Sequence, residues 1–169
     1  MDDQQERPVG LDFVAGLVTG EGSFCIAVQR MRGDRFRFIP IFSMAMTDTD
    51  TMEIVAQTMK DNGLPVYMRR KDPTHPGAQP QVEMRIAGYK RIQPLLESLI
   101  PYLTGTKKQS AILVSQFVAL RADRPANSKP SEDEFELIRR LRIMNGNRRG
   151  KKTPLESPEA IRRTELSRL

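Results

Sequence analysis

The 169-residue chain contains one cysteine, Cys25, one histidine, His75, and no tryptophan. A single cysteine excludes an intrachain disulfide framework, and together with a single histidine it excludes a structural zinc site. His75 lies in the Pro-rich stretch 72–80, which we expect to form a surface loop.

Long apolar runs are also missing. No stretch approaches the roughly 20 apolar residues that a membrane-spanning helix needs. The first six residues are Met-Asp-Asp-Gln-Gln-Glu, and this acidic start differs from the basic start of a signal peptide. We therefore expect an intracellular protein, in the cytoplasm or nucleoid of a prokaryote or in an organelle, with no membrane partner.

Positive charge is present in excess. The chain has 27 Lys+Arg against 21 Asp+Glu, a net charge of +6, and 38% hydrophobic residues, enough for a sizeable core. A basic chain favours polyanionic partners, with nucleic acid first and an anionic membrane surface second. The basic excess lies in the second half, with a cluster at Arg148, Arg149, Lys151 and Lys152. This cluster is either a solvated loop or a phosphate-binding segment.

The hydrophobic spacing predicts helices and hairpins. Leu11, Val14 and Val18 recur at helical spacing, so we expect a short helix capped by Asp12 and ended by Gly20. The other expected elements are strands over 23–32 and 35–46, a helix over 51–62, strands over 66–71 and 81–86, helices over 89–100, 107–122 and 131–145, and a last short helix from residue 157. Hairpins without βαβ crossovers predict an α+β fold with an antiparallel sheet.

The stretch Leu11-Asp-Phe-Val-Ala-Gly-Leu-Val-Thr-Gly-Glu-Gly-Ser-Phe24 carries the chemistry. The small residues Ala15 and Gly16 leave room for close backbone approach. Glu21, between two glycines, stands where helix gives way to strand and can project toward a metal or a polar substrate. The alternative is a glycine-rich turn that carries an ordinary surface glutamate.

Val14-Ala-Gly-Leu-Val-Thr-Gly-Glu-Gly22 resembles the motif of the LAGLIDADG homing endonucleases. One motif in a short chain, followed by ββαββα and C-terminal helices, is typical of the single-motif, homodimeric members. The resemblance implies an α+β fold with an αββαββα core, an antiparallel DNA-binding sheet and extra C-terminal helices. It implies one endonuclease domain over residues 1–169, with its core at about 10–122 and a helical extension at about 131–169.

The resemblance also implies a mechanism. Two copies of the motif helix would pack along a two-fold axis through Val14, Ala15, Gly16 and Val18. Glu21, with Gly20, would bind a divalent metal, normally Mg²⁺, for which Ca²⁺ or Mn²⁺ can substitute, and the metal would support phosphodiester hydrolysis. The chain departs from the motif at Thr19, where the first acidic residue usually stands; Thr19 caps the helix end or sits at the interface.

Two further positions match the family's site. Asp48 falls where the family places a polar residue that orients water, although it is equally a helix N-cap. The family's basic residue near the scissile phosphate falls within Leu103-Thr-Gly-Thr-Lys-Lys-Gln109. Lys107 is the first choice and Lys108 the second, whereas an ungapped match gives Thr106.

In this family the sheet reads the major groove, so one strand face is core and the other faces DNA. The alternating pattern assigns Cys25 and Ala27 to the second face, and each polar residue there is either a DNA contact or an ordinary solvent-facing side chain. The expected DNA contacts are Gln29, Arg35, Arg37, Ser43, Arg69, Lys71, Gln81, Glu83, Arg85, Lys108, Arg148, Lys151 and Lys152. Ile39 and Ile41 break the polar pattern, through a twist, a bulge at Pro40, or contact with thymine methyl groups. Pro40 itself indicates an edge position or a bulge.

The resemblance therefore implies a sequence-specific double-strand DNA homing endonuclease, encoded in an intron, that acts as a homodimer on a long pseudo-palindromic site. Its partners would be double-stranded DNA and a second copy of the chain, with no small-molecule substrate. The alternatives are an RNA-splicing maturase and a non-catalytic DNA-binding regulator on the same fold. Glu21 favours cleavage, because a pure binder gains nothing from a carboxylate beside a phosphate.

Overall fold

The computed structural model describes residues 9–31, 35–73, 75–122, 124–125, 128 and 130–146. Its elements are α1 (Leu11–Glu21), β1 (Gly22–Met31), β2 (Arg35–Met46), α2 (Thr49–Asp61), β3 (Met68–Lys71), β4 (Gln81–Ala87), α3 (Tyr89–Leu99), α4 (Gly105–Ala122) and α5 (Glu132–Met144). The four strands form one antiparallel sheet in the order β1-β2-β4-β3. The predicted α+β class and the αββαββα order are confirmed.

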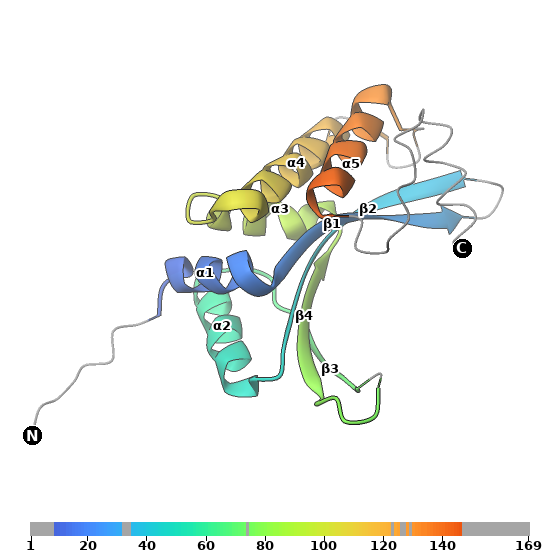
Figure 1. Cartoon of the computed structure of the whole chain (residues 1–169). Coiled ribbons are helices and arrows are strands. Elements are labelled where there is room, and N and C mark those ends of the chain that lie inside the picture. Colours follow the sequence, from blue (N-terminus) through green and yellow to red (C-terminus); the bar gives the residue numbers. More distant parts are fainter. Residues whose placement is uncertain are drawn as a thin grey trace, which may run out of the picture.

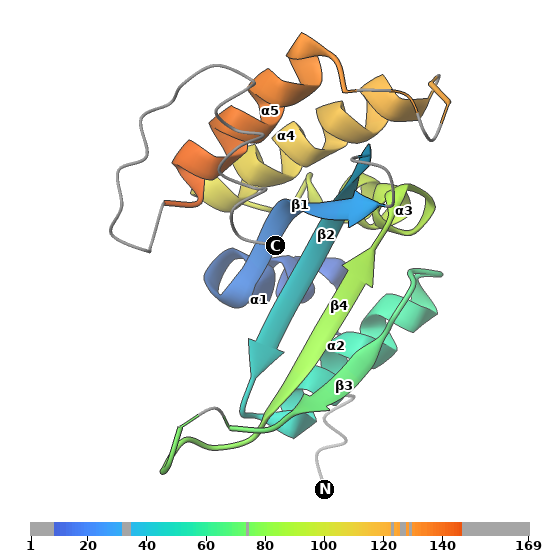
Figure 2. The same ribbon diagram turned by 90° about the vertical axis from the view of Figure 1, so that its right-hand side faces the viewer.

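The five helices of the described residues pack on one face of the sheet. In Figure 1 the sheet is seen nearly edge-on, with α1 and α2 beside its lower part and α3, α4 and α5 beside its upper part. Figure 2 looks toward the opposite face, which we call the outer face. β1 and β2 curve away from the direction of β3 and β4, so the outer face is concave (Figure 1).

The inner face of the sheet supplies much of the core. Phe24, Phe42 and Met84 have no exposed surface, and Phe38 lies edge-on to Phe135 of α5 with ring centroids 5.8 Å apart. Burying each such side chain contributes about 1.5–3 kcal/mol of transfer free energy. Because Phe135 and its neighbours on α5 join the same apolar cluster, α5 is part of the core.

β2 is an internal strand of the sheet, but Pro40 lies just beyond the end of the β2–β4 ladder, where β2 pairs with β1 alone, so the expected edge position is confirmed locally. Pro40 pairs with Ile26 of β1, and its carbonyl accepts a hydrogen bond of 2.9 Å from the amide of Gly88. Its nitrogen faces the same side of the strand as this carbonyl. The β2–β4 ladder ends at Ile41 and Ala87, so no strand partner remains there to need an N–H group from residue 40.

The first helix differs from the prediction at both ends. Gly10 is its N-cap and Asp12 lies in its first turn, so Asp12 does not cap it. The helix continues through Gly20 to Glu21 and ends at Gly22, where a β-carbon would lie 2.6 Å from the Val18 carbonyl oxygen. Close packing at residue 22 therefore sets the end of the helix.

The other boundaries agree with the prediction within about three residues, the usual uncertainty at element ends. The largest of these differences is two residues: β3 begins at Met68 and not at residue 66, α2 begins at Thr49 and not at residue 51, and α4 begins at Gly105 and not at residue 107. The helix expected from residue 157 lies outside the described residues. Within the part of the chain that the structure describes, no helix has the length and apolarity to cross a lipid bilayer.

Candidate active site and nucleic-acid interface

Glu21 is the last residue of α1 and is exposed. Its carboxylate has no hydrogen bond or ion pair with the described part of the chain, and the last turn of α1 holds no basic residue. A carboxylate at this end of a helix is unfavourable, because the helix dipole is negative there. Helix stability therefore does not explain the glutamate, and its predicted role in metal binding stays a prediction.

Lys107 extends from the first turn of α4 to the end of α1. Its Nζ donates a hydrogen bond to the carbonyl oxygen of Gly22, although the two residues are 85 positions apart in the chain. Thr106 is exposed and Lys108 is half-buried. Of the three candidates for the basic residue, Lys107 is the one that this bond brings beside Glu21. Its role in the reaction stays a prediction.

Asp48 caps α2. Its two carboxylate oxygens accept hydrogen bonds from the Thr51 hydroxyl (2.7 Å) and the Thr51 amide (3.1 Å). These bonds, the hydroxyl bond first, lower the pKa of Asp48 below its ordinary value. Gly22, the residue after the end of α1, pairs with Met44 in the β1–β2 ladder. Asp48 follows the end of β2 at Met46, so it lies farther along the chain than the residue that pairs with Gly22. The capping role is therefore observed, and the water-orienting role stays a prediction.

The exposed side of α1 is lined by small residues. Gly16 and Gly20 are exposed, and a β-carbon added to either would meet no atom within 4 Å. Phe13 lies on the same side and is 41% exposed. This side of α1 offers a second helix a close approach, because only glycine backbone intervenes.

Three of the four residues predicted at a dimer interface are not on this side. Val14, Ala15 and Val18 have no exposed surface within the single chain, because they pack in its own core. Within the single chain, Gly16 is the one of the four that is exposed to a partner, and the dimer interface itself stays a prediction. Thr19 does not cap the end of the helix; its hydroxyl donates a hydrogen bond of 2.8 Å back to the carbonyl of Ala15.

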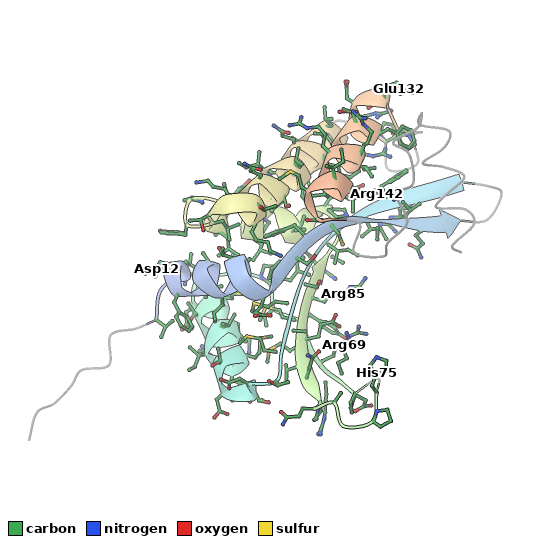
Figure 3. The ribbon with its side chains drawn as sticks, in the orientation of Figure 1. Asp12, Arg69, His75, Arg85, Glu132 and Arg142 are labelled. Carbon is green, nitrogen blue, oxygen red and sulfur yellow. The ribbon has the colours of Figure 1, made fainter. Side chains whose placement is uncertain are left out.

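The polar side chains of the strands share the outer face. Directly paired residues in an antiparallel ladder point to the same side of the sheet. The ladders pair Gln29 with Arg37, Ser43 with Arg85, Arg69 with Glu83, and Lys71 with Gln81. Figure 3 shows the side chains of Arg69 and Arg85 pointing away from the helices. The predicted division of the strands into a core face and a polar face is therefore confirmed.

Glu83 introduces negative charge into this face. Its Oε2 lies 2.5 Å from Arg69 Nη2, and the Glu83 side chain is 13% exposed against 50% for Arg69. A pair that involves an exposed arginine contributes little to stability. Its effect is to neutralise the carboxylate, so that the outer face stays basic through Lys71 and Arg85.

Several sequence predictions cannot be placed in full. Arg35 is the first residue of β2, but its side chain lies outside the described part, as do Arg148, Lys151 and Lys152. His75 is exposed at the tip between β3 and β4 (Figure 3), as expected of a surface loop. Cys25 is half-buried on the outer face; burial raises the pKa of its thiol, and the positive charge of Arg85 opposes that rise.

Two features of the structure were not predicted from the sequence. Phe13 was not singled out, although its position out of phase with Leu11, Val14 and Val18 marks it as exposed. Asn145, at the end of α5, was also missed: its amide donates to the Phe24 carbonyl of β1 (2.8 Å) and its side-chain oxygen accepts from Ser110 of α4 (3.1 Å). These two hydrogen bonds connect the end of α5 to β1 and α4. No pattern in the sequence around Asn145 predicts them.

A complete metal site is not present within the described residues of one chain. They contain no group of three or more His, Cys, Asp or Glu side chains placed to hold an ion. The donors available at the end of α1 are the Glu21 carboxylate and nearby backbone carbonyls. These are hard oxygen ligands, which suit Mg²⁺ or Ca²⁺, but one carboxylate needs further ligands from elsewhere.

The sequence matches no family model and no curated protein. Among solved structures the chain is similar to the homing endonuclease I-TnaI, with a TM-score of 0.63 and 18% identity over 96% of this chain and 99% of that one. It is similar to the homing endonuclease I-CvuI in complex with a DNA target, with a TM-score of 0.58 and 17% identity over 94% of this chain and 92% of that one.

A third similar structure is the LAGLIDADG homing endonuclease I-SmaMI bound to cleaved DNA, with a TM-score of 0.61 and 17% identity. The match covers 94% of this chain and 48% of that one, so the chain spans about half the length of I-SmaMI. The three likenesses show that the chain has the fold of the LAGLIDADG homing endonucleases. The resemblance seen in the motif is thereby confirmed at the level of the fold.

Proposed function

We propose that the chain is a sequence-specific homing endonuclease that cleaves double-stranded DNA as a homodimer. The observation that carries the proposal is the end of α1, where the exposed Glu21 and the ammonium group of Lys107 lie beside the start of the sheet. The outer face of that sheet is concave and basic (Figures 1 and 3). Proteins similar in fold are homing endonucleases, two of them in complex with DNA.

A homodimer follows from the shortage of carboxylates. One chain supplies one exposed carboxylate at the end of α1, and two copies related by a two-fold axis would supply two. The exposed glycine side of α1, with Phe13, supports this axis, since Gly16 and Gly20 let two helix backbones approach closely. The same axis would give two sheets, and therefore a pseudo-palindromic DNA site.

The reaction would need a divalent metal. Glu21 and the backbone carbonyl of Gly20 would hold Mg²⁺, and hard oxygen donors suit it. When bound, such an ion supplies charge stabilisation and an activated water for phosphodiester hydrolysis. I-CvuI has been crystallised with DNA in the presence of Mg and of Ca, and the same ions are the natural choice here.

The remaining site residues would bind and orient. Lys107 fixes the end of α1 through the Gly22 carbonyl and places positive charge where the phosphate would lie. The exposed carboxylate of Asp48 would orient water while it caps α2. Arginine and lysine of the outer face would contact base edges and phosphates. The catalytic unit would be one domain, in which α5 of the predicted C-terminal extension packs into the same core as residues 10–122, and it would be encoded within a mobile intron.

The proposal is tested by cleavage. The purified chain is incubated with DNA that spans candidate intron-insertion sites, with and without Mg²⁺, and the product ends are sequenced. We expect double-strand breaks at one long site that depend on the metal. DNA binding without cleavage in either Mg²⁺ or Mn²⁺ would favour the non-catalytic regulator, and specific binding to intron RNA would favour the maturase.

A further inference from the structure

The outer face of the sheet contains an apolar patch that the proposed function does not explain. We define it as Cys25, Ala27, Ile39, Ile41 and Ala87. The ladders join these residues directly, because Ala27 pairs with Ile39 and Cys25 pairs with Ile41, which in turn pairs with Ala87. The structure thus shows a continuous patch and not isolated exceptions to the polar pattern.

The accessible part of the patch is the pair Ala27 and Ile39. Both are half-buried, whereas Ile41 is only 6% exposed. The β2–β4 ladder has ended at Ile41, so Ile39 lies where only β1 and β2 continue as a two-stranded ribbon (Figure 1). Figure 1 shows α4 and α5 on the opposite side of this ribbon, and among the described residues no helix lies on its outer side.

Polar and basic side chains surround the patch. Gln29 and Arg37 form the next pair along the ribbon, and Ser43 and Arg85 form the pair on the other side. An apolar floor with a basic rim fits a partner that is negatively charged at its edges and locally apolar between them. The major groove of DNA has this character, because phosphates line it and the 5-methyl group of thymine projects into it.

We propose that Ala27 and Ile39 contact pyrimidine 5-methyl groups in the major groove and thereby select thymine over cytosine. A two-stranded ribbon fits in that groove. Ile39 contributes most of the apolar contact, and the small side chain of Ala27 leaves room for the methyl group. The inference rests on the proposed DNA binding and adds to it a base preference and the residues that set it.

The test removes single methyl groups from the DNA. Duplexes that bind the chain tightly in Ca²⁺ are selected from a randomised library, and each thymine in a selected site is replaced in turn by deoxyuridine. At one or a few thymines per half-site, we expect the substitution by deoxyuridine to lower the affinity of the chain for the duplex about fourfold, the value for one buried CH₂ group. At the same positions cytosine should bind more weakly than 5-methylcytosine, which separates the methyl group from the rest of the base.

Variants assign the effect to the patch. In Ile39→Thr the deoxyuridine penalty should fall most, because Ile39 contributes most of the apolar contact, and in Ala27→Ser it should fall by a smaller amount, because Ile39 is still present. Ile54→Thr is the matched control, since Ile54 is 44% exposed on α2, and it should keep the full penalty. Thermal unfolding shows whether each variant is folded; if Ile39→Thr is not, Ala27→Ser alone decides.

The outcomes are distinguishable. Tight binding without a penalty at any thymine overturns the inference and leaves the proposed function standing. An equal penalty in the wild type and in both folded patch variants also overturns it. Failure to select any DNA sequence overturns the proposed function itself.

Discussion

Lys107 of α4 donates a hydrogen bond to the backbone carbonyl of Gly22, the residue that follows Glu21. This bond ties the end of the motif helix to a helix that begins more than 80 residues later in the chain. It also places a positive charge at the negative end of α1, where it offsets the unfavourable position of the Glu21 carboxylate. The Lys107 side chain therefore both fixes the position of the end of α1 and adds a positive charge to the candidate site.

Replacing Lys107 should affect stability and cleavage together. In Lys107→Ala the Gly22 carbonyl loses its partner, and we expect the free energy of unfolding to fall by about 1–2 kcal/mol. Cleavage should slow without being abolished, whereas DNA affinity in Ca²⁺ should change little. Urea unfolding, single-turnover cleavage and gel-shift titration measure the three effects. Lys90→Ala, at an exposed position on α3, is the control, and equal behaviour of the two variants would contradict this role.

Replacing Glu21 should separate binding from cleavage. Glu21→Gln keeps the shape of the side chain but removes the charge that would hold Mg²⁺, so cleavage should be lost. DNA binding should persist, because it rests on the outer face, and the fold should be slightly stabilised because a carboxylate leaves the negative end of the helix. Plasmid cleavage and gel shifts in Ca²⁺ measure this, with Glu53→Gln on α2 as control. Full cleavage by Glu21→Gln would place the chemistry elsewhere.

Substitutions at two glycines of the motif, Gly16 and Gly22, should have different effects on dimerisation and stability. Gly16→Leu fits the single chain, since nothing lies within 4 Å of its β-carbon, but it should block a second helix and abolish dimerisation. Gly22→Ala should destabilise the single chain, because the new β-carbon meets the Val18 carbonyl at 2.6 Å. Light scattering and thermal unfolding distinguish these outcomes. A Gly16→Leu protein that still dimerises would show that the interface lies elsewhere.

Asp48 should make stability depend on pH. Its bonds to Thr51 lower the pKa of the carboxyl below 3.8, so their contribution is present above that value and is lost as pH falls through the lowered pKa. Between about pH 5 and about pH 2 the wild type should lose more stability than Asp48→Asn, which also caps helices but does not titrate. Urea unfolding across this range measures it. At neutral pH, full cleavage by folded Asp48→Asn would leave Asp48 with the capping role alone.

Basic residues should divide into those that read bases and those that bind phosphates. Arg85→Ala should cost about 1–3 kcal/mol on a site with a matched guanine and far less on random DNA. Lys151→Ala should weaken binding to all sequences about equally and reduce the salt dependence of the affinity. Titrations on both DNAs at several salt concentrations measure this. Equal losses on both DNAs for Arg85→Ala would make it a phosphate contact.

Local patterns in the sequence were sufficient to predict the fold class and to assign the strand residues to the two faces of the sheet. Alternation in β1, β2 and β4 places Phe24, Phe42 and Met84 inside, and the structure agrees. The spacing of Val14, Ala15 and Val18 also identifies a buried helix face. The family resemblance suggested that these residues face a partner, but an apolar helix stripe first fills the chain's own core, so the accessible side of α1 is the glycine side.

Contacts between distant segments could not be predicted. Neither the bond from Lys107 to Gly22 nor the bond from Asn145 to Phe24 has a signature within a window of a few residues. An ungapped match to the family favours Thr106. Such a match does not show how the first turn of α4 is oriented, and therefore does not show which of its side chains reaches the end of α1. Similarly, Pro40 indicated an edge position, but the sequence did not show that this edge arises where the β2–β4 ladder ends within an internal strand, because the extent of that ladder depends on the whole sheet.

The division of the sheet into a core face and an outer face explains how this chain can share its fold with I-CvuI and I-TnaI at low sequence identity. In β4 the side chains of Met84 and Ile86 are buried, while Arg85 between them is exposed, so a change at residue 85 leaves the packing untouched. Substitutions at such positions usually alter stability by less than about 0.5 kcal/mol. Exposed positions of this kind on the strands are therefore free to diverge without loss of the architecture. Chains of this kind can drift to 17–18% identity while each acquires its own surface.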